Sequence, residues 1–138
     1  PRHMYLLDTN IIVEFLRGRL PHTYRVFMRS DPRMFAVPAI VEAELCYGVE
    51  RAKDPTKERM IVGRFLSPFK IAPFDSRCAE HYGRIRATLA SRGKTIGPND
   101  LLIAATALAN GAVLVTRNAR EFQRVPGLTV EVWDEAEP

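Results

Sequence analysis

Cysteine is scarce in this 138-residue sequence, which contains only Cys46 and Cys78. Two thiols are too few for a disulfide scaffold, and their spacing matches no pattern of metal ligands. Both lie in helical contexts with apolar neighbours, so we expect them to be buried free thiols in a reducing cytoplasm.

Long apolar runs are absent as well. No stretch approaches the ~20 apolar residues that a membrane span needs, and no signal peptide is visible. The sequence also lacks a phosphate-binding loop of the Gly-x4-Gly-Lys-Ser/Thr type, and no Ser/His/Asp arrangement stands out. His22 and His81 have no second ligand or base at a suitable spacing, so we interpret them as structural or surface residues.

The composition fits a single compact domain. Hydrophobic residues make up 46% of the chain, which is enough for one core. We place this domain at residues 4–133. We expect residues 1–3 to be a remnant of cloning, with the natural chain starting at Met4, and residues 134–138 to form a loose acidic tail. The formal net charge of +4 indicates either a polyanionic partner, nucleic acid first, or an ordinary excess of arginine.

Short apolar strands alternate with amphipathic helices along the chain. Strands are predicted at 4–7, 34–37, 71–72, 112–115 and 128–132. Helices are predicted at 11–17, 21–30, 39–53, 56–66, 76–91 and 99–109, with a helical turn at 119–123. This alternation predicts an α/β fold in which helices flank both faces of a small, mostly parallel central sheet.

Asp8 directly follows the first predicted strand. In open α/β sheets, ligands bind outside the carboxyl ends of the strands, which makes Asp8 a candidate site residue. The alternative is a helix N-cap, a position that aspartate favours. Thr9 or Asn10 could cap the helix instead and leave Asp8 to face the crevice.

Asp100 stands at the head of a predicted helix that is otherwise almost entirely apolar. It could be a first-turn acid that the helix dipole stabilises. However, Asn99 can serve as the cap, and a carboxylate at the head of a buried helix is costly to desolvate unless it has a partner. A metal ion is one such partner.

Two further acids, Glu42 and Glu44, lie two residues apart on a predicted helix and therefore face different directions. We favour Glu44 for the crevice and interpret Glu42 as a solvated or capping acid. Gly48, one turn after Glu44, would allow another backbone to approach closely at that edge of the helix.

Thr116, Asn118 and Glu121 follow the fourth predicted strand. Taken alone they indicate a turn and a surface charge, but they fall near Asp8 if this strand lies beside the first. Several carboxylates at one crevice repel each other, so some must protonate or a cation must bind. All-oxygen ligands suit Mg²⁺ or Mn²⁺ and not zinc, and such a site can hydrolyse phosphodiester bonds.

Four motifs occur in an order that resembles a known family. They are Leu6-Leu7-Asp8-Thr9-Asn10, Glu44-Leu45-Cys46-Tyr47-Gly48-Val49, Ile96-Gly97-Pro98-Asn99-Asp100-Leu101-Leu102-Ile103-Ala104-Ala105 and Val115-Thr116-Arg117-Asn118-Ala119-Arg120-Glu121-Phe122. Together they resemble the PIN-domain proteins of the VapC toxin type, and the resemblance extends from Met4 to about Trp133.

The resemblance implies a three-layer α/β/α PIN-like fold and a Mg²⁺-dependent endoribonuclease, with Mn²⁺ as a second candidate metal. Such a protein is the toxin of a type II toxin–antitoxin pair and inhibits translation. The resemblance also implies an RNA substrate such as tRNA or rRNA and a VapB-type antitoxin that blocks the site with a C-terminal segment. It further implies a homodimer and a cytoplasmic location without membrane contact.

The family's acids carry over by position to Asp8, Glu44 and Asp100, which are implied to be catalytic residues and metal ligands. A fourth acid of many family members falls on Asn118 here, and Glu121 could supply the missing charge as a catalytic acid. Supporting hydrogen bonds to the acids or their waters are expected from Asn10, Thr116 and Asn118.

Basic residues are expected to hold the RNA backbone, although each could equally be a solvated surface residue. The candidates are Arg17, Arg19, Arg117 and Arg120, followed by Arg25, Arg29 and Arg124. For protein partners, the predicted helices at 39–53 and 56–66 offer the surface. Beside them, we assign Phe65, Leu66 and Phe69 to the core in preference to an interface.

Other functions stay open at this stage. Because Asn118 replaces an expected acid, the domain could be a catalytically weak module that binds RNA or protein. The same metal chemistry could also serve a DNA nuclease or a phosphatase. The lack of a second aspartate two residues after Asp8 argues against an aspartyl-phosphate phosphatase.

Overall fold

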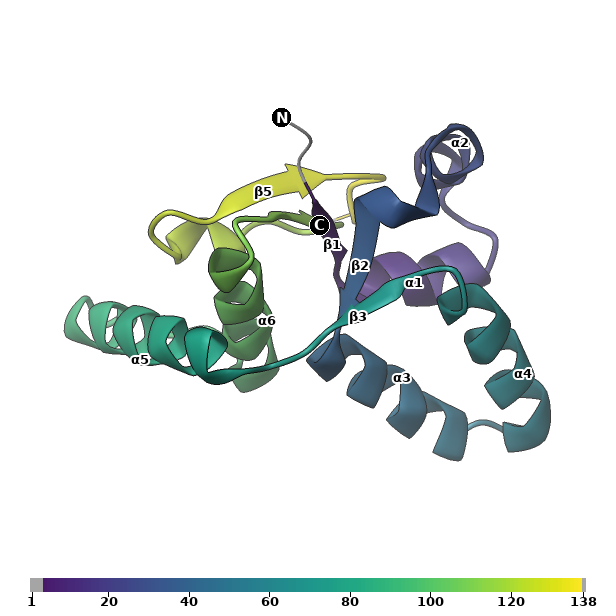
Figure 1. Ribbon diagram of the computed structural model, residues 1–138, viewed down its shortest axis with the longest axis horizontal. Helices are drawn as coiled ribbons and strands as arrows, with labels where there is room; N and C mark the ends of the chain where they lie inside the picture. The colour runs from purple at the N-terminus through teal and green to yellow at the C-terminus, as the bar shows by residue number, and fades with distance from the viewer. Residues whose placement is uncertain (1–3, 138) are drawn as a thin grey trace.

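The computed structural model describes residues 4–137 and shows a parallel sheet flanked by helices (Figure 1). The strands are β1 (Tyr5–Leu7), β2 (Phe35–Pro38), β3 (Lys70–Ala72), β4 (Val113–Thr116) and β5 (Thr129–Val132). The helices are α1 (Thr9–Leu16), α2 (Pro21–Arg29), α3 (Ala39–Glu50), α4 (Pro55–Leu66), α5 (Ser76–Ser91) and α6 (Pro98–Ala109), with 3₁₀ turns η1 (Pro32–Met34) and η2 (Phe122–Arg124). The predicted α/β/α architecture is confirmed.

The strand order is β3-β2-β1-β4-β5, and every neighbouring pair within residues 4–137 is parallel. Helices α1 to α4 lie on one side of the sheet, and α5 and α6 lie on the other (Figure 1). The connections therefore change direction between β1 and β4. In such sheets, ligands bind outside the carboxyl ends of the strands at this switch point.

The two central strands form the middle of the core, as expected for parallel strands covered on both faces. Leu6 and Leu7 of β1 and Leu114 and Val115 of β4 are completely buried. Helix α6 is apolar on nearly every side and is buried along most of its length, so its N-terminal end is held firmly beside the sheet. No helix in the described range is long and apolar enough to cross a membrane.

Aromatic side chains fill the space beneath α2 and α4. Phe27 packs on Phe35, Phe65 and Phe69, with ring centroids 5.3, 6.1 and 6.0 Å apart. Leu66 packs against the same core. The assignment of Phe65, Leu66 and Phe69 to the core is thus confirmed.

Two helices begin earlier than predicted. Helix α1 starts at Thr9 instead of Ile11, because Asp8 itself is the N-cap and accepts a hydrogen bond from the Thr9 N–H at 2.8 Å. Helix α6 starts at Pro98, so the expected cap at Asn99 is wrong. Proline favours the first helical position, where its missing N–H leaves no hydrogen bond unmade.

Other element boundaries shift by a few residues. Helix α3 ends at Glu50 and not at residue 53. Asp54, expected only to stop that helix, caps α4 by accepting a hydrogen bond from the Lys57 N–H at 3.1 Å. The helical turn predicted at 119–123 lies slightly later, at η2.

Two predictions on α3 are wrong. Cys46 is exposed, although Cys78 is buried as expected. A Cβ added to Gly48 would meet nothing within 4 Å, so no backbone approaches it closely. The buried residues of α3 are Val41, Leu45 and Val49, and both Cys46 and Gly48 lie off this stripe.

The C-terminal tail is held in place at Asp134, which contradicts the expectation of a loose segment. Its carboxylate accepts hydrogen bonds from the backbone N–H groups of His22 and Thr23 at 3.1 and 2.8 Å. It also accepts one from Thr23 Oγ1 at 2.8 Å. The expected remnant at 1–3 and the last tail residue lie outside the described residues.

Candidate active site

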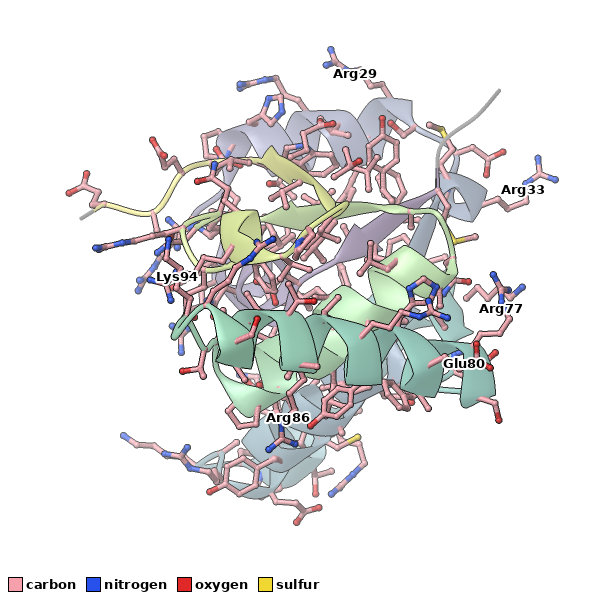
Figure 2. All side chains as sticks on the ribbon, turned by 90° about the vertical axis from the view of Figure 1, so that its left-hand side faces the viewer. Arg29, Arg33, Arg77, Glu80, Arg86 and Lys94 are labelled. Atoms are coloured by element: carbon pink, nitrogen blue, oxygen red, sulfur yellow. The ribbon has the colours of Figure 1, made fainter. Side chains whose placement is uncertain are left out.

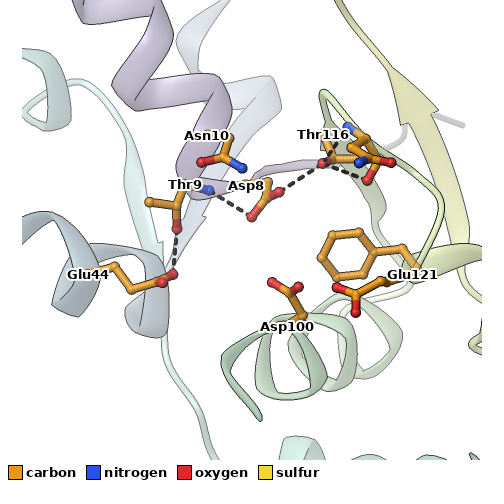
Figure 3. Close-up of a pocket in the computed structure, with 9 residues that line it drawn as sticks. Asp8, Thr9, Asn10, Glu44, Asp100, Thr116 and Glu121 are labelled. Atoms are coloured by element: carbon orange, nitrogen blue, oxygen red, sulfur yellow. Dashed lines mark hydrogen bonds between the residues drawn. The ribbon is translucent and has the colours of Figure 1, made fainter. Parts of the chain in front are cut away.

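A cavity of about 180 Å³ opens at the carboxyl ends of β1 and β4, at the switch point of the sheet. Side chains converge on it from α1, α3, α6 and the segment after β4 (Figure 3). The lining residues are Asp8, Thr9, Asn10, Glu44, Asp100, Thr116, Asn118, Glu121 and Phe122. The four acids and three supporting polar residues that the sequence indicated therefore line one cavity.

Asp8 is the most buried of these acids, with 6% of its surface exposed. Its Oδ1 accepts the Thr9 N–H and its Oδ2 accepts the Thr116 hydroxyl, each at 2.8 Å. Burial raises the pKa of Asp8 in spite of the bonds from Thr116 and Thr9, and the charge of Glu44 adds to the rise. Asp8 thus both caps α1 and faces the cavity, two roles that the sequence presented as alternatives.

Glu44 reaches the cavity from α3, whereas Glu42 does not line it, as predicted. Thr9 Oγ1 donates a hydrogen bond to Glu44 Oε1 at 2.6 Å (Figure 3). Thr9 therefore joins α1 to α3 and fixes one carboxylate oxygen of Glu44. The sequence carries no signal for this bond, because the two side chains are 35 residues apart.

Asp100 enters from the first turn of α6, beside Glu121 from the segment after β4 (Figure 3). The pKa of Asp100 rises from 3.8 to about 7. Burial is the main cause, followed by the charge of Asp8, a hydrogen bond with Glu121, and the charges of Glu121 and Glu44. At neutral pH the cavity therefore gathers more negative charge than its own hydrogen bonds compensate.

Thr116 ends β4 and anchors the segment that follows. Besides donating to Asp8, its buried Oγ1 accepts the Asn118 N–H at 3.3 Å. Asn118 Oδ1 accepts the Arg120 N–H at 3.0 Å, so this side chain shapes the turn while lining the cavity. Asn10 also lines the cavity, and its side chain makes no hydrogen bond to any other residue within 4–137.

The available donors fit a hard divalent cation. They are carboxylate, amide and hydroxyl oxygens, which Mg²⁺ and Mn²⁺ favour, and no cysteine or histidine lines the cavity. As the side chains lie, no three His, Cys, Asp or Glu residues in the described chain are close enough together to hold an ion. A cation would have to draw the acids together or bind through water, and it would relieve the repulsion that raises the pKa of Asp100.

The arginines named as RNA contacts fall into two groups. Arg17 and Arg19, at the end of α1, form ion pairs with Glu14 at 3.2 and 3.8 Å. Arg117 donates from Nε to a backbone oxygen at 2.9 Å. Neither Arg117 nor Arg120 forms an ion pair with another described residue.

The similarity to known proteins extends over nearly the whole chain. Residues 5–128 match the family model of the PIN domain. Ribonuclease VapC2 of Rickettsia felis is 40% identical over 133 residues, which cover 95% of this chain and 98% of that protein. The tRNA(fMet)-specific endonuclease VapC of Salmonella typhimurium is 36% identical over 129 residues, which cover 94% and 97% of the two proteins.

Solved structures agree with these relatives. A chain in the crystal structure of VapBC2 from Rickettsia felis, bound to a DNA fragment from its promoter, matches with a TM-score of 0.86 and 38% identity over 95% of this chain and 99% of that one. DNA-bound VapBC from Salmonella typhimurium matches with a TM-score of 0.89 and 35% identity over 95% and 98%. The protein with this carboxylate-lined cavity therefore belongs to the PIN-domain family, in its VapC branch.

Proposed function

We propose that this protein is a Mg²⁺- or Mn²⁺-dependent endoribonuclease whose reaction takes place in the cavity between β1 and β4. The observation that carries the proposal is the convergence of four carboxylates from four separate segments, Asp8, Glu44, Asp100 and Glu121, on one cavity. The relatives described above are named as ribonucleases or as a tRNA endonuclease, which supports RNA as the substrate.

Asp8, Glu44 and Asp100 would hold the metal ion, directly or through water. When bound, such an ion polarises the scissile phosphate and lowers the pKa of a water molecule. The Thr116 hydroxyl holds Asp8 in one orientation, and the Thr9 hydroxyl does the same for Glu44.

Further groups complete the site. Glu44 completes the acidic pocket, where it either binds the metal or orients the attacking water. Glu121 supplies negative charge where Asn118 stands in place of an acid. Asn10 donates hydrogen bonds to the waters that surround the acids.

The biological role that we propose is that of a toxin in a toxin–antitoxin pair. The Salmonella typhimurium relative is named as a tRNA(fMet)-specific endonuclease, which favours tRNA over rRNA as the substrate. Cleavage of tRNA removes a component of translation, so the unrestrained enzyme would stop protein synthesis.

A VapB-type antitoxin is the proposed partner, because the matching solved structures are VapBC complexes. A groove of about 330 Å³ beside the cavity shares Glu44 with it and lies between α1, α3 and α4. Its apolar lining residues include Val13, Leu16, Leu45, Val49, Ile61 and Val62. An antitoxin segment in this groove would end next to the acids. The homodimer stays a prediction from the family resemblance.

The proposal is tested with the purified chain and total RNA, by mapping the cleavage ends. We expect cleavage with Mg²⁺ or Mn²⁺, none with a chelator, and none by the Asp8→Ala variant. The matched control is Glu42→Ala, which removes an acid of the same helix as Glu44 without touching the cavity, and it should cut normally. Full activity of Asp8→Ala would refute the proposal, and RNA that is retarded without being cut would favour the binding module.

A further inference from the structure

Cations are distributed unevenly around the acidic cavity. On the α1 side, Arg17 and Arg19 both form ion pairs with Glu14, so this carboxylate offsets one of their two charges. On the opposite side, where Glu121 lies in Figure 3, the segment 117–124 carries three arginines that form no ion pair within the described chain. Among the described residues, more unpaired arginines therefore lie beside this edge of the cavity than on the α1 side, where two arginines share one carboxylate.

Hydrogen bonds position two of these arginines without neutralising them. Arg117 Nε donates to a backbone oxygen of the C-terminal tail at 2.9 Å, and Arg124 Nη1 donates to the backbone oxygen of Thr95 at 3.0 Å. A carbonyl acceptor is neutral, so each guanidinium keeps its full charge. The side chain of Arg120 is exposed. Its backbone N–H donates a hydrogen bond to Oδ1 of Asn118, a lining residue of the cavity.

The bond from Arg124 to Thr95 brings a second segment to this edge, the loop between α5 and α6. This loop leads into the N-terminal end of α6, where a Cβ at Gly97 would lie 3.7 Å from Oδ2 of Asp100, a lining residue of the cavity. Lys94 of the same loop is exposed and forms no ion pair with a described residue. Figure 2 shows side-chain nitrogens gathered at the end of the molecule where Lys94 lies.

We propose that the substrate strand crosses the active site along this edge, where its phosphates next to the scissile bond are held. The cationic edge consists of Lys94, Arg117, Arg120 and Arg124. The inference rests on the proposed function, because an RNA backbone is repelled by the four acids and needs cations beside them to bind. On the opposite side, the groove between α1, α3 and α4 has one cation among its described lining residues, Arg17, which pairs with Glu14.

The test separates binding from cleavage. Fluorescence anisotropy measures the affinity of a labelled single-stranded RNA oligonucleotide for the full chain carrying Asp8→Asn, over a range of salt concentrations. Adding Lys94→Gln, Arg120→Gln or Arg124→Gln should each weaken binding several-fold. The plot of log affinity against log salt has a negative slope. Each substitution should also make this slope less steep by about 0.7, the value for one phosphate contact on a single strand.

Two matched variants serve as controls. Arg64→Gln removes an exposed arginine of α4 that also forms no ion pair in the described chain, and it should leave the slope unchanged. Arg17→Gln tests the opposite side and should also leave the slope unchanged. Arg124→Gln loses the bond to Thr95 as well as a charge. Arg124→Lys keeps the charge, so normal RNA binding by this variant would assign the loss to charge. An unchanged melting temperature of Arg124→Gln would show that its fold is intact.

The outcomes are distinct. The proposal would be overturned if the triple variant Lys94→Gln, Arg120→Gln and Arg124→Gln bound RNA like its parent. It would also be overturned if only Arg17→Gln made the salt dependence of binding less steep. Absence of measurable RNA binding by the parent would overturn it too. Failure of the proposed function looks different: the chain with Asp8 intact would bind RNA through the edge and still not cut it with Mg²⁺ or Mn²⁺.

Discussion

At the scale of single residues, the acids of the cavity lower the stability of the fold that carries them. Burial and mutual repulsion raise the pKa values of Asp8 and Asp100. A raised carboxyl pKa means that the folded protein disfavours the charged form. Functional sites commonly keep such unfavourable charges, because the ligand that they bind supplies the compensation.

Replacing Asp100 by asparagine should therefore stabilise the metal-free protein at neutral pH. The unfolded chain titrates this carboxyl near 3.8 and the folded chain near 7, so between these values the folded state binds more protons and loses stability as pH rises. After allowance for solvent screening, we expect Asp100→Asn to add roughly 1–2 kcal/mol at pH 7.5 and little at pH 4. Thermal melts with a chelator across this range measure the difference.

The control for this prediction is Glu80→Gln, an exposed acid of α5 paired with Arg84, which should change stability little at any pH. Equal stability of Asp100→Asn and the unsubstituted chain at pH 7.5 would show that the acids do not repel each other as described.

Thr9 acts as a positioning residue for Glu44, through the 2.6 Å hydrogen bond between their side chains. Thr9→Val keeps the size of the side chain but removes the hydroxyl, so Glu44 should bind metal less well. We expect the Mg²⁺ concentration for half-maximal RNA cleavage to rise by about tenfold or more, whereas Thr9→Ser should restore it. An unchanged Mg²⁺ requirement for Thr9→Val would mean that Glu44 needs no such support.

At the scale of elements, the ends of helices are stabilised by residues distant in sequence. Helix α2 has Leu20 at its N-cap and no capping side chain of its own. The carboxylate of Asp134 takes that place and binds the free N–H groups of His22 and Thr23. It thereby ties the end of the chain, after β5, to a helix near its beginning.

Asp134→Asn should weaken this clamp, because the amide has one acceptor oxygen where the carboxylate has two. The expected loss at neutral pH is about 1–2 kcal/mol of unfolding free energy, measured by urea denaturation. Partial burial opposes ionisation of Asp134, but the bonds from Thr23 and His22 outweigh it and lower its pKa.

A lowered pKa sets the pH dependence of this loss. The stabilisation is complete above the ordinary carboxyl range and disappears as pH falls through the pKa of the folded state. The difference between Asp134→Asn and the unsubstituted chain should shrink in acid accordingly. Glu137→Gln, at an exposed tail position, is the control, and an equal loss there would argue against the clamp.

At the scale of the whole molecule, the sheet topology assembles the site. β1 and β4 are neighbours although more than half of the chain separates them, and their carboxyl ends bring Asp8 and Thr116 into contact. α3 and α6 then bring one acid each from opposite sides of the switch point. The site forms only when the complete fold forms, because each acid comes from a separate segment.

Divalent metal should consequently stabilise the whole fold. A ligand that binds only the native state at a hundred times its Kd adds about 2.7 kcal/mol, so the melting temperature should rise with Mg²⁺ or Mn²⁺ concentration. Asp8→Asn and Asp100→Asn should lose most of this rise, and Glu42→Gln should keep it. A rise of equal size in all variants would place the metal elsewhere.

Much of the fold could be predicted from local patterns. The apolar run before Asp8, the apolar helix after Asp100 and the alternation of strands and helices indicated a parallel α/β sheet. The spacing of Glu42 and Glu44 implied that only one of them faces the cavity, and Glu44 is the one that lines it. The exposed Cys46 was missed because its apolar neighbours suggested burial, although its position lies off the buried stripe of Val41, Leu45 and Val49.

The sequence by itself determined which segments are strands and helices and which acids follow them, since these depend on hydrophobic periodicity and on neighbouring residues. Only the tertiary structure decided that Thr9 holds Glu44, that Asp134 caps α2 and that unpaired cations lie along one edge of the acidic cavity. These features are contacts between residues far apart in the chain. Their geometry arises when the sheet brings the segments together, and a one-dimensional pattern contains no measure of that distance.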